Sequence, residues 1–151
     1  KNGFMGNKDF GMPDLQGGYW GVAVADHDRE EIILTRKYYV FGQFTKFLRP
    51  GCRLLYCGEN AIAGWEEITG RLCVVAVNVS ADAEELRVHH SEFGIEAGNI
   101  WRIRTSGGMK DGENWRTERI EGSCQQGILE DELPPYSVTT YVMDGTFTLS
   151  E

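Results

Sequence analysis

The feature that most constrains the fold is a change of hydrophobic period at Pro50-Gly51. Before this pair, residues 37–51 read KYYVFGQFTKFLRPG, with apolar side chains every three to four residues. That spacing predicts one amphipathic helix. Thr35 is its expected N-cap, and the Pro-Gly pair is its expected stop. The predicted apolar stripe is Val40 or Phe41, then Phe44, then Phe47 or Leu48.

After the stop, the period becomes two and turn residues separate short apolar runs. Eight such runs at this spacing predict a mainly β fold, an antiparallel β-sandwich preceded by the helix. We therefore divide the chain into residues 1–51, an irregular segment with a short strand at Tyr19–Ala25 and the helix, and residues 52–151, the sandwich. The predicted sandwich strands are Cys52–Cys57, Ala61–Ile68, Leu72–Ser80, Glu85–His90, Asn99–Thr105, Asn114–Ile120, Gly127–Asp131 and Ser137–Met143.

One strand departs from the usual alternation of apolar and polar side chains. Within Leu72–Val79, two sets of alternate positions are apolar: Leu72, Val74 and Ala76 form one, and Cys73, Val75, Val77 and Val79 form the other. A strand that is buried on one face alone has polar residues on the other. We therefore expect this strand to be central in its sheet, with its second face covered by the helix or by a domain outside this chain.

Composition restricts the classes of partner and leaves the compartment open. The net charge of −8 argues against nucleic acid, because phosphate binding needs a cationic surface. No apolar run approaches the ~20 residues that span a bilayer, and the start, KNGFMGNKDF, lacks the apolar core of a signal peptide. The composition is that of a soluble globular protein. Whether the protein is secreted or cytoplasmic depends on sequence upstream of this segment.

The cysteines and histidines do not form a recognisable metal or nucleophile motif. The four cysteines include no C-x-x-C pair and no histidine at zinc-ligand spacing, which predicts free and mostly buried thiols. His89 and His90 are adjacent and would point to opposite faces of a strand. We therefore predict no metal site and no cofactor.

The acidic residues do not form the pair that glycoside hydrolysis requires. Two carboxyl groups must flank the scissile bond, but the acidic pairs here are adjacent in sequence, and neighbours on a strand point to opposite faces. We interpret them as solvated surface charge and predict that this chain contains no catalytic residue. The pairs are Glu30/Glu31, Glu66/Glu67, Glu84/Glu85 and Glu130/Asp131.

Three features each allow a binding interpretation and a structural one. The charged cluster Asp26–Glu31 offers oxygen ligands for a cation, but a charged surface turn is favoured because the glycine and distal glutamate of a calcium loop are missing. Tyr19 and Trp20 are either a sugar platform or a buried aromatic anchor. The remaining tryptophans are expected to pack in or beside the sandwich rather than to form a binding stripe: Trp65, Trp101 and Trp115.

The helix segment resembles a motif of glycoside hydrolase family 30, where YY-x-x-G-x-(F/Y)-(S/T)-(K/R)-(F/Y)-(I/L)-R-P-G joins the last barrel helix to a side β-sandwich. Three further segments are similar to that family's sandwich strands: VVAVNVS at 74–80, IRTS at 103–106 and LPPYSVTTYVM at 133–143. The resemblance covers roughly residues 19–145. The helix positions that match are Tyr38, Tyr39, Gly42, Phe44, Thr45, Lys46, Phe47, Leu48, Arg49, Pro50 and Gly51.

The resemblance implies that this chain is the end of a larger enzyme. Family members are retaining enzymes whose two catalytic glutamates lie on a (β/α)8 barrel, upstream of the segment present here. Residues 19–25 would then lie near the last barrel strand, with Tyr19 or Trp20 facing the glycan, and residues 35–48 would be the last barrel helix. The implied residues of the barrel–sandwich junction are Tyr38, Tyr39, Phe44, Phe47, Arg49, Pro50 and Gly51.

Within this family, activities include glucosylceramidase, xylanase, β-1,6-glucanase and β-1,6-galactanase. The sequence of the helix is most similar to that of bacterial galactanase-like or xylanase-like members. The first hypothesis is a non-catalytic C-terminal portion of such an enzyme, with the upstream barrel as its partner and a β-linked glycan as the substrate of the parent protein. An autonomous carbohydrate-binding module is the alternative, and an adhesion or interaction sandwich is the third. Without the barrel, we expect exposed strand edges and an apolar helix face to cause self-association.

Overall fold

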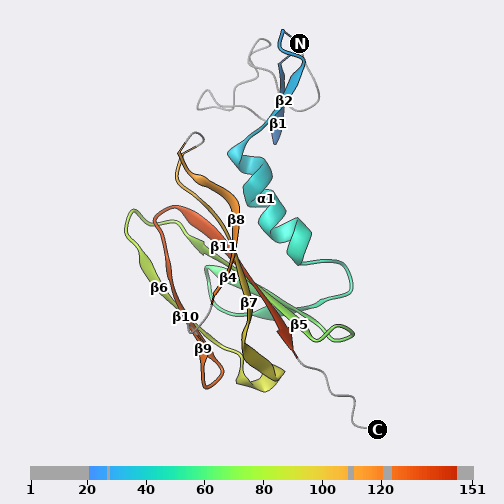
Figure 1. Cartoon of the computed structure of the whole chain (residues 1–151), viewed down its shortest axis with the longest axis vertical. Coiled ribbons are helices and arrows are strands. Elements are labelled where there is room, and N and C mark those ends of the chain that lie inside the picture. Colours follow the sequence, from blue (N-terminus) through green and yellow to red (C-terminus); the bar gives the residue numbers. More distant parts are fainter. Residues whose placement is uncertain (1–20, 27, 109–110, 121–123, 146–151) are drawn as a thin grey trace. The chain divides into compact units, whose positions relative to one another are not determined.

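A computed structural model describes residues 21–26, 28–108, 111–120 and 124–145 (Figure 1). The chain divides into two compact units, residues 1–42 and 43–151. The boundary lies inside the single described α-helix, α1, which spans Arg36–Phe47. The division into domains at residue 51 stays a prediction.

In the first unit, the described residues before the helix form one antiparallel hairpin. Strand β1 (Ala23–Asp26) pairs with β2 (Glu31–Leu34). The Asp26 carboxylate accepts hydrogen bonds from the backbone N–H groups of Asp28 and Arg29 at 3.1 and 3.2 Å, which closes the charged turn. Thr35 directly precedes α1, and its hydroxyl donates to the carbonyl of Val22 at 2.8 Å. Its role as an acceptor for the N–H groups of the first turn stays a prediction.

The second unit is a two-layer antiparallel sandwich, as the sequence predicts. A six-stranded sheet has the order β3-β4-β5-β11-β7-β8, and a three-stranded sheet has the order β6-β10-β9. Neither sheet closes into a barrel within the described residues. The strands are β3 (Arg53–Tyr56), β4 (Ala61–Glu66), β5 (Arg71–Asn78), β6 (Glu84–His89), β7 (Ile95–Ser106), β8 (Glu113–Arg119), β9 (Cys124–Gln125), β10 (Ile128–Leu133) and β11 (Ser137–Gly145).

All eight predicted sandwich strands are present, with shifted ends. The largest shift is in β7, which begins at Ile95 rather than Asn99. The two-residue strand β9 was missed, because a run that short carries no measurable period. A short 3-10 turn, η1 (Ser91–Phe93), links β6 to β7, and Gly94 after it has a φ of 62°, in the left-handed region that favours glycine.

The core lies between the two sheets. Residues from β4, β5 and β11 contact residues from β10, and most of them are almost fully buried. Trp65 packs against Phe93 with ring centroids 4.9 Å apart. The main core residues are Trp65, Leu72, Val74, Ala76, Ile100, Leu129, Leu133, Tyr141 and Met143.

The prediction for the doubly apolar strand is confirmed within β5, whereas Val79 lies beyond the end of the strand and is 66% exposed. Strand β5 is interior, between β4 and β11. Leu72, Val74 and Ala76 face the sandwich core, whereas Cys73 and Val75 are buried on the opposite face of the sheet. That second face is covered by the C-terminal half of α1, as the contacts described next show.

Candidate functional site

One buried amide fixes the C-terminal half of α1 to the six-stranded sheet. Gln43 is fully buried. Its amide nitrogen donates to the carbonyl of Ile103 at 3.2 Å, to the hydroxyl of Thr105 at 3.1 Å and to the carbonyl of Val138 at 3.3 Å. Its amide oxygen accepts the hydroxyl hydrogen of Thr140 at 2.6 Å. Both ends of the amide are therefore satisfied by strands β7 and β11. We call these five residues the Gln43 cluster.

Sequence reasoning missed Gln43, because it lies between the positions of the predicted apolar stripe. Phe41, one of the two candidates for the first position of that stripe, is 60% exposed. Phe44 and Phe47 are half-buried. The available signal was a lone amide in an otherwise apolar and aromatic stretch of helix, since a buried amide needs partners on both its nitrogen and its oxygen.

The last turn of α1 packs closely on β4. A Cβ atom added to Gly64 would lie 2.9 Å from Cδ2 of Leu48 and 3.0 Å from Sγ of Cys52. Those distances are below ordinary van der Waals contact, so the missing side chain of Gly64 is what admits Leu48. The ammonium of Lys46 lies 4.9 Å from the ring centroid of Trp115, at the distance of a cation–π contact.

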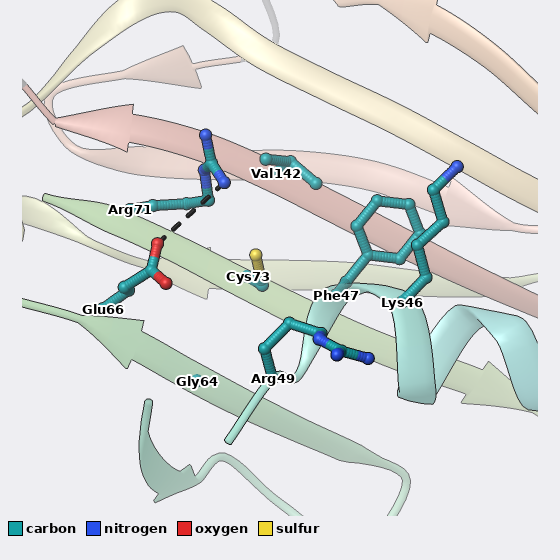
Figure 2. A pocket seen from close by; sticks show the side chains of 8 residues that line it. All are labelled: Lys46, Phe47, Arg49, Gly64, Glu66, Arg71, Cys73 and Val142. Atoms are coloured by element: carbon teal, nitrogen blue, oxygen red, sulfur yellow. Dashed lines mark ion pairs between the residues drawn. The ribbon is translucent and has the colours of Figure 1, made fainter. Parts of the chain in front are cut away.

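A pocket of about 250 Å³ opens where the helix ends over the sheet (Figure 2). Figure 2 shows Glu66 and Arg71 at one end of it, Lys46 and Phe47 at the other, and Cys73 and Val142 between them. Its lining residues are Lys46, Phe47, Arg49, Gly64, Glu66, Arg71, Cys73 and Val142.

The pocket does not carry the groups needed to cleave a glycosidic bond. Glu66 is the one acid in its lining, and it lies 3.9 Å from the guanidinium of Arg71, which also bonds Asp144 at 3.1 Å. A retaining enzyme needs two carboxyl groups about 5–5.5 Å apart. Burial raises the pKa of the Cys73 thiol to about 11, so the thiol is protonated at neutral pH and is a poor nucleophile.

A second polar cluster lies inside the sandwich, around Asp131 of β10. Both oxygens of Asp131 accept from Nη1 of Arg102, at 2.7 and 2.8 Å. Nη2 of Arg104 lies 3.2 Å from Asp131, and the hydroxyl of Tyr141 donates to it at 2.7 Å. Arg102 also donates to Glu118 on β8. We call these five residues the Asp131 cluster.

The surroundings of Asp131 keep it ionised. Burial raises the pKa of this carboxyl, but hydrogen bonds from Arg102 and Tyr141 outweigh burial, so the pKa lies below its ordinary value. A carboxylate of this kind holds two sheets together and does not donate a proton at neutral pH. The prediction of solvated charge is right for Glu130, which pairs with Arg87 at the surface, and wrong for Asp131, whose side chain is 13% exposed.

The structure describes some of the predicted site residues and not others. Tyr19 and Trp20, the predicted glycan-facing pair, lie outside the described residues. Tyr38 and Tyr39 are half-buried and meet edge to face, with ring centroids 5.4 Å apart. The junction assignment that includes them stays a prediction. Its three loop residues are exposed, and Gly51 has a φ of 101°: Arg49, Pro50 and Gly51.

The three later tryptophans do not form one binding stripe. Trp65 is buried in the sandwich core, whereas Trp101 is partly exposed and Trp115 lies beside Lys46. They therefore lie in different surroundings and do not present coplanar rings to solvent, which agrees with the expectation that they pack in or beside the sandwich.

Cys52, Cys57 and Cys73 carry free thiols as predicted, although burial holds for Cys73 and fails for the exposed Cys57. The described residues contain no group of three or more His, Cys, Asp or Glu side chains that could hold a metal ion. Of the helices in the described part of the chain, none has the length and apolar character to cross a membrane.

The β-sandwich, together with helix α1 that precedes it, has a fold known from solved structures. It is similar to the glycoside hydrolase family 30 subfamily 8 xylanase from Clostridium acetobutylicum, with a TM-score of 0.64 and 22% identity over 86% of this chain and 31% of that one. It is also similar to a family 30 endoxylanase from Clostridium papyrosolvens C71, with a TM-score of 0.58 and 21% identity over 75% and 28% of the two chains. The catalytic domain of family 30 xylanase C from Talaromyces cellulolyticus gives a TM-score of 0.58 and 18% identity over 82% and 27%.

These matches show a shared fold. The chain spans less than a third of each of the three xylanase chains. No protein-family profile matches the sequence. No curated protein matches it significantly either.

Proposed function

We propose that this chain is the non-catalytic C-terminal portion of a retaining glycoside hydrolase that acts on a β-linked glycan. Its role is to pack against an upstream (β/α)8 barrel and to stiffen the scaffold that holds the catalytic carboxylates. The observation that carries the proposal is the likeness to family 30 xylanases over most of this chain and less than a third of theirs.

The chemistry of the described residues supports a scaffolding role. Asp131, whose side chain is 13% exposed, is committed to two arginines and a tyrosine, and Glu66 is the one acid in the lining of the pocket. The Gln43 cluster supports a mechanical link between helix and sheet, since one amide side chain joins α1 to two strands. A rigid link of this kind transmits stability to whatever the helix packs against.

The first test is the reading frame upstream of this segment and the enzyme that it encodes. We expect a barrel with two glutamates on it, and hydrolysis of xylan or galactan by the whole protein. In that protein, Gln43→Leu should shorten the half-life of activity on heating and leave KM unchanged, because the substitution weakens the scaffold and touches no substrate. An upstream region without a barrel would refute the proposal.

The isolated chain provides a second test. It should hydrolyse neither xylan nor galactan nor glucan, and affinity electrophoresis in gels that contain these polymers should show no retardation. Retardation would instead favour the alternative, a carbohydrate-binding module, for which the partly exposed Trp101 is the best candidate contact.

We also propose that the isolated chain self-associates. Strand β3 lies at the edge of the six-stranded sheet, and two of its side chains are strongly exposed: Leu54 at 61% and Tyr56 at 85%. An edge strand with exposed apolar side chains is a template for pairing with another chain. Light scattering should show dimers or larger species at high concentration, and Leu54→Lys should reduce them. A monomer at all concentrations would contradict this.

A further inference from the structure

We propose that the pocket at the end of α1 binds a small organic anion, one carboxylate carried on a single six-membered ring. This inference does not depend on the scaffolding role, because every residue that lines the pocket belongs to the 43–151 unit.

The interior of the pocket suits the ring. Cys73 and Val142 lie between the two charged ends, and the ring of Phe47 forms a wall beside them (Figure 2). The Cys73 thiol adds no charge, because burial holds its pKa at about 11. Gly64 contributes no side chain to this part of the lining. An apolar face is therefore available for the C–H or aromatic face of a ligand.

The charged ends of the pocket suit the carboxylate. Three cations and one acid line it: Lys46, Arg49 and Arg71 against Glu66. This local excess of positive charge occurs in a chain whose net charge is −8. Arg71 is already paired with Asp144 at 3.1 Å and with Glu66 at 3.9 Å. The exposed side chains of Lys46 and Arg49 therefore supply the charge that a ligand would meet. A guanidinium such as that of Arg49 can donate two hydrogen bonds to one carboxylate.

The size of the pocket limits the ligand to one ring. A volume of about 250 Å³ is at the small end of ligand sites, which commonly enclose roughly 300–1,000 Å³. A polymer chain would have to leave most of its length outside. The pocket therefore fits a free acid or the charged terminal ring of a larger molecule.

The test compares two probes of the same shape that differ in charge. Benzoate and benzamide are titrated into the isotopically labelled chain, and the NMR shifts of the Val142 methyls and of the Cys73 amide are followed. We expect benzoate to bind about fivefold more tightly than benzamide at low salt, the range that exposed charge pairs supply. The preference of the pocket for benzoate over benzamide should decrease at high salt, because salt screens the charges that line the pocket.

Variants identify the groups responsible. Lys46→Gln and Arg49→Gln change exposed side chains, and each should reduce the preference for benzoate. Arg87→Gln is the matched control, because it removes the same charge from the outer face of the other sheet and should leave the preference unchanged. Equal binding of the two probes, no binding of either, or shifts confined to residues outside the pocket would each overturn the proposal.

A second pair of probes distinguishes the source of the acid. Galacturonate and galactose differ by one carboxylate on a sugar ring. Saturable shifts with galacturonate and weaker ones with galactose would identify a sugar acid as the natural class. Shifts with benzoate alone would identify an aromatic acid. Binding of galactose as tight as that of galacturonate would contradict an anion site.

Discussion

The Gln43 cluster and the Asp131 cluster lie on opposite faces of the same six-stranded sheet. They differ in how their buried polar side chains are paired. Both remove polar side chains from water. The Gln43 cluster is neutral and matches donors to acceptors between a helix and two strands. The Asp131 cluster is charged and joins the two sheets through one acid and two arginines. The neutral cluster depends on hydrogen-bond geometry, whereas the charged cluster depends on the balance between attraction and desolvation.

Removing the acid from the charged cluster should have the largest effect. Asp131→Asn leaves Arg102 and Arg104 without their shared counter-ion, in positions where their side chains are 18% and 11% exposed. We expect the free energy of unfolding to fall by about 3–5 kcal/mol, measured by urea denaturation. Glu130→Gln is the matched control, because Glu130 pairs with Arg87 at the surface, and it should cost about 0–1 kcal/mol. Equal costs for the two variants would contradict the role given to Asp131.

Breaking the neutral cluster should have a smaller effect. Gln43→Leu keeps the side-chain volume but removes the amide oxygen that accepts from the Thr140 hydroxyl and the amide nitrogen that donates to the carbonyls of Ile103 and Val138. We expect the free energy of unfolding to fall by about 2–3 kcal/mol. Thr45→Ala, at an exposed helix position two residues further on, should change it by less than about 0.5 kcal/mol. A neutral result for Gln43→Leu would mean that apolar packing alone holds the helix on the sheet.

Low pH should weaken the Asp131 cluster and leave the Gln43 cluster unchanged. The pKa of Asp131 is depressed in the folded chain, so its contribution is present above the unfolded value, about 3.9, and is lost as pH falls through the folded value. The cost of Asp131→Asn should therefore stay constant from pH 7 to about pH 4 and shrink only as the pH falls further, toward the cost of Glu130→Gln. The cost of Gln43→Leu should stay constant over the same range. The measurement is urea denaturation of all three variants at each pH. A parallel decline of both costs would show that the acid effect is not specific to Asp131.

The smallest effect concerns the contact between Lys46 and Trp115, at the edge of the neutral cluster. Lys46→Gln removes a cation that lies 4.9 Å from the centroid of the indole ring. We expect the free energy of unfolding to fall by about 0.5–1 kcal/mol and the fluorescence of Trp115 to change. Lys46→Arg should restore most of the loss, since guanidinium also stacks on aromatic faces. No recovery with arginine would indicate that the aliphatic part of Lys46, rather than its charge, makes the contact.

Much of the fold could be predicted from the sequence because it follows from local periods. The helix before Pro50, the eight sandwich strands and the central place of β5 all derive from spacing of apolar residues within single segments. The candidate site was less predictable. Phe44 and Phe47 follow from helix period, but the pocket brings Phe47 to Val142, 95 positions later in the sequence, and no local pattern contains that pairing.

The sequence by itself determined where the chain is helical, where it is extended and where it turns, because these depend on neighbours within a few residues. The tertiary structure alone decided which polar residues are buried and with which partners. Gln43 meets Thr140 across 97 positions, and Arg102 meets Asp131 across 29. The physical reason is that a buried polar group needs a partner supplied by another element, and strand order and register, not local period, choose that partner.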